Sequence, residues 1–325
     1  MALSNPLSHF RVSESDRSLD LSRRAFCASV GVSAAALAAG SLSRDVFGAP
    51  LMAASPPGAR GVAPKAYPIG LELYSVRREL ARDLPATLRA VSQMGYQVVE
   101  FYAPYLAWTI PYAKDVRTQL DDLGLKCYST HNPSTALIGD AMPKAIEINQ
   151  VLGARHIIMA SPPPNTTTAE DWTRVSGQLT TASKQLEPHG LLAGFHNHKI
   201  EWLPLAGGQR IMDVLATNTP PEFVLQFDVG TCLEAGQDPI AWIKGHPGRI
   251  RSVHLKDWAP GSEADQKGYR VLFGEGVAPW KQILDAVEST GGVEYYLMEQ
   301  EGSRYSELET AQRCLATWRK MRATA

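Results

Sequence analysis

The sequence has almost no net charge and is poor in cysteine and in aromatic residues. Its 32 Lys and Arg residues are balanced by 33 Asp and Glu, which gives a formal net charge of -1. A nucleic-acid-binding protein needs a basic excess to neutralise phosphates, so we expect no nucleic-acid partner. With 44% hydrophobic, 20% charged and 8% aromatic residues among 325, the composition is that of a soluble globular protein. A disordered chain, a collagen-like repeat and a coiled coil are disfavoured.

Residues 1–54 are predicted to be an export signal. Residues 1–24 are polar, and residues 25–43 carry no charge and consist mainly of Ala, Ser, Gly and Val. The run Ser22-Arg23-Arg24-Ala25-Phe26 resembles a twin-arginine export signal, which is read by a receptor and anchors nothing in the membrane. A membrane helix is the alternative, but a stretch this rich in Ala, Ser and Gly has little of the necessary apolarity.

Cleavage within residues 48–54 would leave a tail over residues 55–66 and a protein located in the periplasm. Three of the four cysteines then remain, Cys127, Cys232 and Cys314. An odd number at wide spacing is not a disulfide framework, so we expect buried free thiols.

From residue 67 onward, short apolar runs alternate eight times with longer stretches of helical periodicity. The expected strands are 68–74, 96–101, 125–130, 155–160, 191–197, 222–228, 250–256 and 294–300, and the expected helices are 83–94, 112–123, 140–152, 169–187, 208–217, 238–245, 279–290 and 305–322. Eight such units predict one α/β domain over residues 67–325, a single (β/α)₈ TIM barrel. The alternative is an open doubly wound sheet, but no Gly-x-Gly-x-x-Gly follows the first strand.

Catalytic groups in such barrels lie at the carboxyl ends of the strands. Four successive strand ends carry potential metal ligands, namely His196, Asp228, His254 and Glu299. Two imidazoles and two carboxylates suit a borderline or hard divalent ion. Because side chains alternate along a strand, the neighbouring Phe195, Phe227, Val253 and Met298 are expected to point outward to the helices.

Further polar residues are expected near the same rim. His198 shares a face with His196, Lys256 shares a face with His254, and His131 follows the third strand. Glu72 and Glu100 are expected to point inward and to bind substrate together with His131, because a buried carboxylate needs a partner. Glu201 is interpreted either as a partner of the site or as a loop carboxylate. The other histidines, His9, His156, His189 and His246, are expected to be structural or solvated.

The order of short motifs resembles the xylose-isomerase-like sugar phosphate isomerase/epimerase barrels. These motifs are Gly70-Leu71-Glu72, His196-Asn197-His198, Gln226-x-Asp228-Val229-Gly230, Val253-His254-Leu255-Lys256-Asp257, Gly274-Glu275-Gly276 and Glu299-Gln300-Glu301. The resemblance implies one divalent ion held by His196, Asp228, His254 and Glu299. We expect Mn²⁺ first, with Zn²⁺, Mg²⁺ and Co²⁺ as alternatives.

One position departs from this family. Many of its epimerases have Glu where this chain has His196, and they use that residue with the strand-eight Glu as an acid/base pair. A metal-bound imidazole is a poor proton carrier, so His198, Glu201 or Lys256 would have to supply the second group, with Glu299 as the other. The His-Asn-His form resembles a subgroup that includes exported proteins associated with 3-keto sugars and glycosides.

These residues predict a metal-dependent isomerase, epimerase or lyase that acts on a keto sugar or 3-keto-glycoside. The metal would stabilise an enediolate formed by loss of the proton next to the carbonyl, and isomerisation, epimerisation and β-elimination all start from it. The expected binding partner is a small sugar or glycoside. We expect the protein to have no stable membrane anchor. It could also form a homo-oligomer. The alternatives are a non-catalytic exported sugar-binding protein and, more remotely, an endonuclease acting on abasic DNA.

Overall fold

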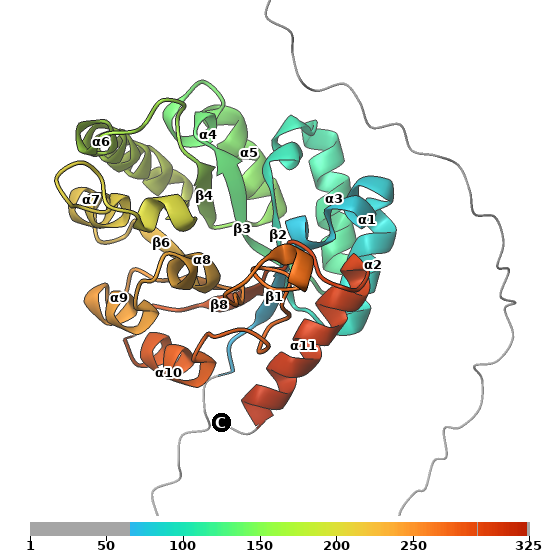
Figure 1. Ribbon diagram of the computed structural model, residues 1–325. Coiled ribbons are helices and arrows are strands. Elements are labelled where there is room, and N and C mark those ends of the chain that lie inside the picture. The colour runs from blue at the N-terminus through green and yellow to red at the C-terminus, as the bar shows by residue number, and fades with distance from the viewer. Residues whose placement is uncertain (1–65, 291, 324–325) are drawn as a thin grey trace, which may run out of the picture. The chain divides into compact units, whose positions relative to one another are not determined.

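The computed structural model describes residues 66–290 and 292–323, where eight parallel strands form a closed barrel (Figure 1). The strands are β1 (Ile69–Glu72), β2 (Val98–Phe101), β3 (Lys126–Pro133), β4 (His156–Ser161), β5 (Leu192–His196), β6 (Val224–Asp228), β7 (Ser252–Leu255) and β8 (Tyr295–Met298). Each strand pairs with the next along the chain, and pairing of Gly70 with Leu297 closes β1 against β8. The predicted TIM barrel is confirmed.

Helices follow the strands and surround the barrel in Figure 1. They are α1 (Arg77–Arg82), α2 (Leu84–Met94), α3 (Ile110–Asp122), α4 (Thr135–Ile138), α5 (Met142–Leu152), α6 (Ala169–Leu186), α7 (Ile211–Asn218), α8 (Val229–Glu234), α9 (Pro239–Gly245), α10 (Trp280–Thr290) and α11 (Glu307–Ala323). The long helices lie where the sequence predicts them. The short helices α1, α4 and α8 were not predicted, because six or fewer residues are too few for a clear 3.6-residue period.

Local signals in the sequence explain where the helices begin and end. Asp83 Oδ1 accepts a hydrogen bond of 2.8 Å from the Ala86 N–H and so caps α2. Gly124 and Gly153, which follow α3 and α5, have φ of 68° and 78°. Side chains with a Cβ disfavour this left-handed conformation, so glycine lets the chain turn back toward the next strand.

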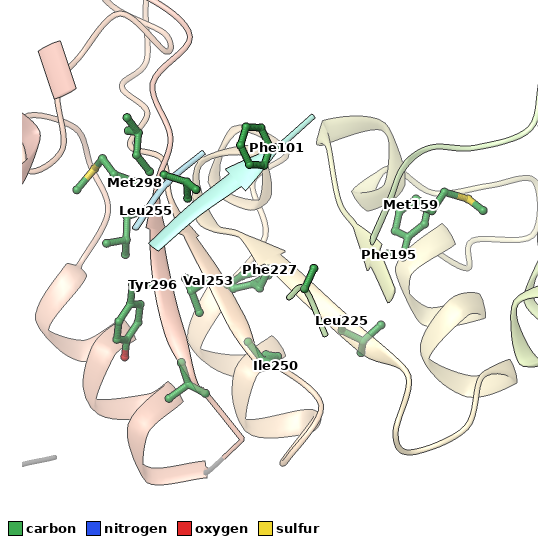
Figure 2. Close-up of a cluster of buried hydrophobic side chains, with 14 of the residues drawn as sticks. Phe101, Met159, Phe195, Leu225, Phe227, Ile250, Val253, Leu255, Tyr296 and Met298 are labelled. Carbon is green, nitrogen blue, oxygen red and sulfur yellow. The ribbon is translucent and has the colours of Figure 1, made fainter. Parts of the chain in front are cut away.

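The alternation of side chains along each strand produces two layers. Phe195, Phe227, Val253 and Met298 are fully buried in the core cluster that the strands share with the helices (Figure 2). Their predicted outward orientation is thus confirmed. Burial of one such side chain contributes about 1.5–3 kcal/mol to folding. A separate small cluster of Val98, Tyr295 and Leu297 is buried apart from this core.

Other predictions have mixed outcomes. Cys127, Cys232 and Cys314 are buried free thiols, as expected. The predicted export signal and nearly all of the tail lie outside the described residues. Within residues 66–290 and 292–323, no helix is both long and apolar enough to cross a membrane.

Candidate active site

The carboxyl ends of β5, β6, β7 and β8 bring the four predicted metal ligands together. His196 and Asp228 are the last residues of their strands, His254 lies one residue before the end of β7, and Glu299 directly follows β8. All four side chains are buried, and one potential ligand atom of each lies within 4.8 Å of the others. The predicted set therefore forms a single cluster.

The free atoms of this cluster fit a divalent cation. His196 Nδ1 and Asp228 Oδ2 are buried without a hydrogen-bond partner among the described residues, while His254 Nε2 lies 2.9 Å from Glu100 Oε2. An unpaired buried polar atom costs about 1–3 kcal/mol, so the unpaired atoms of His196 and Asp228 favour a bound ligand. Two imidazole nitrogens and two carboxylate oxygens are donors that Mn²⁺ or Zn²⁺ accepts.

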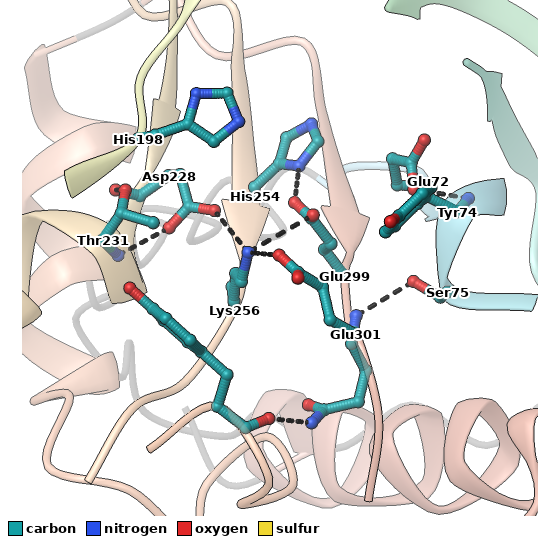
Figure 3. Close-up of polar contacts among 12 residues, drawn as sticks. Glu72, Tyr74, Ser75, His198, Asp228, Thr231, His254, Lys256, Glu299 and Glu301 are labelled. Carbon is teal, nitrogen blue, oxygen red and sulfur yellow. Dashed lines mark hydrogen bonds and ion pairs between the residues drawn. The ribbon is translucent and has the colours of Figure 1, made fainter. Parts of the chain in front are cut away.

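Charged groups within and around the cluster shift the pKa values of its members. His254 Nδ1 lies 2.5 Å from Glu299 Oε2 (Figure 3). Burial alone would lower the pKa of His254, but the Glu100 and Glu299 carboxylates raise it to about 10. Burial raises the pKa of Asp228 to about 7 despite the nearby Lys256. A cation bound by these groups must displace protons, so its affinity is expected to fall as the pH falls.

Glu100 lies at the centre of a buried polar layer. It accepts hydrogen bonds from the Ser129 hydroxyl and, at 2.9 Å, from Gln226 Nε2. Its Oε2 lies 3.1 Å from His131 Nε2 and 2.9 Å from His254 Nε2. Burial would raise the pKa of Glu100, but the two imidazoles lower it to about 2. Glu100 thus holds the predicted ligand His254 from within the barrel and is not among the residues that line the site cavity.

Glu72 differs from Glu100 because it has no cationic partner in direct contact. Its Oε2 accepts a hydrogen bond of 2.6 Å from the Tyr74 N–H, while Oε1 is buried without a partner. Burial raises the pKa of Glu72 well above its ordinary value, and Glu299 and Glu100 add to the rise. A protonated Glu72 can donate a hydrogen bond into the site.

Lys256 lies between three carboxylates (Figure 3). Its Nζ contacts Glu301, lies 3.5 Å from Glu299 Oε1 and 3.8 Å from Asp228 Oδ2, and sits 4.7 Å from the centre of the Tyr269 ring. Burial would lower the pKa of Lys256, but the carboxylates, Glu299 first, raise it. The side chain therefore stays cationic beside Asp228 and Glu299.

His198 is the most accessible of the predicted site residues at this rim. Its side chain is 46% exposed, and its ring meets that of His196 with 5.0 Å between the centres. Burial, followed by Lys256, lowers the pKa of His198 to about 4, so the imidazole is neutral at pH 7. Glu201 is buried and accepts a hydrogen bond of 2.7 Å from the His198 N–H, so it holds the loop that carries His198.

A cavity of about 360 Å³ opens over the cluster. It is lined by Glu72, Tyr74, Tyr102, Ala103, His131, Asn132, Ala160, Ser161, His196, His198, Glu299 and Glu301. Five predicted residues are among them: Glu72, His131, His196, His198 and Glu299. The sequence analysis missed the aromatic wall of Tyr74 and Tyr102, although Tyr74 is the last residue of one predicted strand and Tyr102 directly follows the next.

The remaining described histidines are structural or exposed, as expected. His156 is buried, and its Nδ1 lies 3.1 Å from the Tyr295 hydroxyl, with Tyr295 in the small separate cluster. His246 packs on Trp242 with 3.7 Å between the ring centres, and His189 is exposed. His9 lies outside the described residues. None of the three described rings belongs to the cluster of His196.

A family model described as "Xylose isomerase-like TIM barrel" matches residues 88–321, which include the whole ligand cluster. The chain belongs to the xylose isomerase-like TIM barrel family. The resemblance inferred from the sequence motifs is therefore confirmed at the level of the family and its fold.

Curated relatives of this xylose isomerase-like chain include the inosose dehydratase of Mesomycoplasma hyopneumoniae strain 7448 and that of Lacticaseibacillus casei. The first is 30% identical over 131 residues, which make up 40% of this chain and 41% of the relative. The second is 24% identical over 148 residues, 41% of this chain and 48% of the relative. The chain thus matches less than half the length of these relatives.

Two solved structures resemble the whole barrel. A sugar phosphate isomerase/epimerase from Parabacteroides distasonis ATCC 8503 has a TM-score of 0.65 at 25% identity and covers 78% of this chain and 94% of its own. The IolI protein, solved with a bound zinc atom, has a TM-score of 0.60 at 15% identity and covers 77% of this chain and 96% of its own. The second likeness shows the fold alone.

Proposed function

We propose that this protein is a divalent-metal-dependent enzyme that removes the proton next to the carbonyl of a keto sugar or 3-keto-glycoside. The observation that carries the proposal is the buried cluster of His196, Asp228, His254 and Glu299, in which one potential ligand atom of each residue lies within 4.8 Å of the others beside an open cavity. The similarity to inosose dehydratases and to a sugar phosphate isomerase/epimerase supports a carbohydrate substrate.

The four residues of the cluster would hold the metal. A divalent cation supplies Lewis acidity, which polarises a carbonyl oxygen and stabilises the negative charge that develops on it. Mn²⁺ is the ion we propose first, and the donor set also suits Zn²⁺, Mg²⁺ and Co²⁺.

We assign the base that takes the proton to His198. Its side chain is 46% exposed at the rim of the cavity, and the nearest carboxylate oxygen, on Glu201, is 4.0 Å from Nδ1. In contrast, Glu299 Oε2 is engaged by His254 at 2.5 Å, and Oε1 faces Lys256 at 3.5 Å. A base needs a lone pair within reach of the substrate, and the exposed neutral imidazole of His198 offers one more readily than the buried Glu299 carboxylate between His254 and Lys256.

Lys256 and Glu72 have complementary tasks. The Lys256 ammonium group stabilises the negative charge that builds up on the substrate oxygens as His198 takes the proton. The protonated carboxyl of Glu72 faces the cavity with Oε1 free and can hydrogen-bond to a substrate oxygen. In an elimination, the electron pair left by the proton forms a C=C bond, the bond from the β-carbon to its oxygen substituent breaks, and that oxygen takes up a proton.

The outcome that we favour is β-elimination, because the curated relatives are dehydratases. Isomerisation and epimerisation follow from the same first step, in which the carbon is reprotonated instead. We further propose that the enzyme works in the periplasm after twin-arginine export.

The experiment is hydrogen exchange in D₂O. Mn²⁺-loaded protein is incubated with 3-keto-glucose and methyl 3-keto-glucoside, and deuterium next to the carbonyl is followed by NMR. We expect exchange with the wild type and at least a hundredfold slower exchange with His198→Ala that retains its metal. A ligand that binds without any exchange would show a sugar-binding protein instead of an enzyme.

A further inference from the structure

A second hollow of about 520 Å³ lies beside the site cavity on the carboxyl-end side of the barrel. It is lined by Leu80, Ala81, Arg82, Asp83, Leu84, Pro85, Phe101, Tyr102, Pro104, Tyr105, Trp108 and Tyr112. These residues come from α1, the start of α2, the end of β2 and the segment that leads into α3. We call this hollow the aromatic groove.

Tyr102 connects the groove to the site, because it lines both hollows. Its ring is held by an edge-to-face contact with Tyr74, with 5.3 Å between the centres, and Tyr74 also lines the site cavity. The two hollows therefore adjoin at Tyr102.

One short segment supplies all of the groove's aromatic rings. Residues 101–112 include Phe101, Tyr102, Tyr105, Trp108 and Tyr112, in a chain whose aromatic content is only 8%. Trp108 makes edge-to-face contacts with Phe101 at 5.1 Å, Tyr105 at 6.0 Å and Tyr112 at 5.3 Å between ring centres. These contacts fix Trp108 while leaving it partly exposed, and Tyr112 is 41% exposed.

Some of the polar groups around the groove already have partners within the protein. The Tyr105 hydroxyl donates a hydrogen bond of 2.6 Å to Asn132 Oδ1, and one oxygen of Asp83 caps α2. Arg82 pairs with Glu79 on its own helix. Ring faces and aliphatic side chains supply most of the remaining lining, and a flat apolar ring packs well against such surfaces.

We propose that the aromatic groove binds an aromatic group carried by the sugar, so that the enzyme prefers aryl glycosides to alkyl glycosides. This inference rests on the proposed function, because the sugar part must occupy the site cavity. The size of the groove falls within the range of small-molecule sites, and aromatic side chains with few free polar groups are typical of sites for apolar rings. One well-placed aromatic contact strengthens binding by about tenfold.

The test compares the binding of phenyl and methyl 3-keto-glucoside to the Mn²⁺-loaded full chain by calorimetry. We expect the phenyl compound to bind about tenfold more tightly or better. Trp108→Ala and Tyr112→Ala should each bring the ratio of the two affinities closer to one. Because Trp108→Ala removes core contacts, a second variant fills the groove instead: Ala81→Phe, at an exposed position, should reduce the same ratio.

Arg89→Ala serves as the control, because Arg89 is exposed on α2 and does not line the groove. The ratio of the phenyl to the methyl affinity in this variant should match that of the wild type. Equal affinities for the two compounds, a phenyl preference that survives in Trp108→Ala and Ala81→Phe, or binding of neither compound would overturn the inference. A phenyl preference without deuterium exchange would refute the proposed reaction and leave the groove assignment standing.

Discussion

Asn197 holds the backbone of the proposed ligand Asp228 from both sides. Its Oδ1 accepts a hydrogen bond of 3.0 Å from the Asp228 N–H, and its Nδ2 donates one of 3.1 Å to the Asp228 carbonyl oxygen. Nδ2 also donates to the Thr231 hydroxyl at 2.8 Å, and the Thr231 N–H donates to Asp228 Oδ1 at 2.8 Å. The end of β5 therefore sets the position of the carboxylate on β6.

Asn197→Ala is expected to weaken Mn²⁺ binding by about 10–100-fold, because groups that orient a ligand contribute that much to metal affinity. The affinity is measured by calorimetry at fixed pH. Asn149→Ala is the matched control: Asn149 is equally buried and bonds Tyr105, Thr130 and Ala145, away from the cluster. If both variants are destabilised but both keep wild-type metal affinity, Asn197 does not position Asp228.

Lys256→Gln should separate metal binding from catalysis. Removal of a positive charge 3.8 Å from Asp228 Oδ2 is expected to strengthen cation binding by at least about tenfold. The same change removes charge stabilisation from the substrate oxygens, so deuterium exchange should slow by about a hundredfold. The Mn²⁺ affinity and the deuterium exchange rate are measured in parallel for Lys256→Gln and the wild type. A loss of both together would mean that Lys256 only keeps the site folded.

Glu72→Gln tests whether the protonated carboxyl of Glu72 only donates a hydrogen bond to the substrate or also transfers its proton. A glutamine keeps a hydrogen-bond donor at this place, so a carboxyl that only binds substrate should tolerate the change with less than about a tenfold loss in kcat/KM. Glu72→Ala should cost more, because it leaves the Tyr74 N–H unpaired. A loss of about a thousandfold in Glu72→Gln would show that Glu72 transfers a proton.

The buried His156 is expected to make the fold sensitive to acid. Burial lowers the pKa of His156 to about 4, below the value of about 6.5 in an unfolded chain. The neutral form stabilises the fold fully above pH 6.5, and this contribution is lost as the pH falls toward 4. Its size is on the order of 3 kcal/mol. Chemical unfolding of the wild type and His156→Gln across this range should give curves that converge at low pH, whereas parallel curves would contradict the assignment.

The sequence was sufficient to predict the barrel and the ligand cluster for a definite reason. In a parallel barrel the carboxyl ends of all strands meet at one rim, so residues such as His196 and Glu299, about 100 positions apart, could be placed together without coordinates. Strand alternation likewise predicted the outward orientation of Phe195 and Phe227.

Other features depend on the register between neighbouring strands, which no short motif reveals. The sequence shows Asn197 only as the middle residue of the His-Asn-His motif, and its hydrogen bonds to the Asp228 backbone depend on the offset between β5 and β6. The role of Gln226, which bonds both Glu100 and His131, depends in the same way on side chains from three strands. The dense aromatic segment at residues 101–112 was visible in the sequence, but its connection to the site became clear only once Tyr102 was seen to line both hollows.

The central claim is that His196, Asp228, His254 and Glu299 hold one divalent ion, and anomalous diffraction from crystals grown with Mn²⁺ tests it most directly. The account predicts a single strong anomalous peak within about 2.0–2.3 Å of a ligand atom of all four residues, and its disappearance in His196→Ala and Asp228→Ala. No peak at this position, or a peak that persists unchanged in both variants, would contradict it.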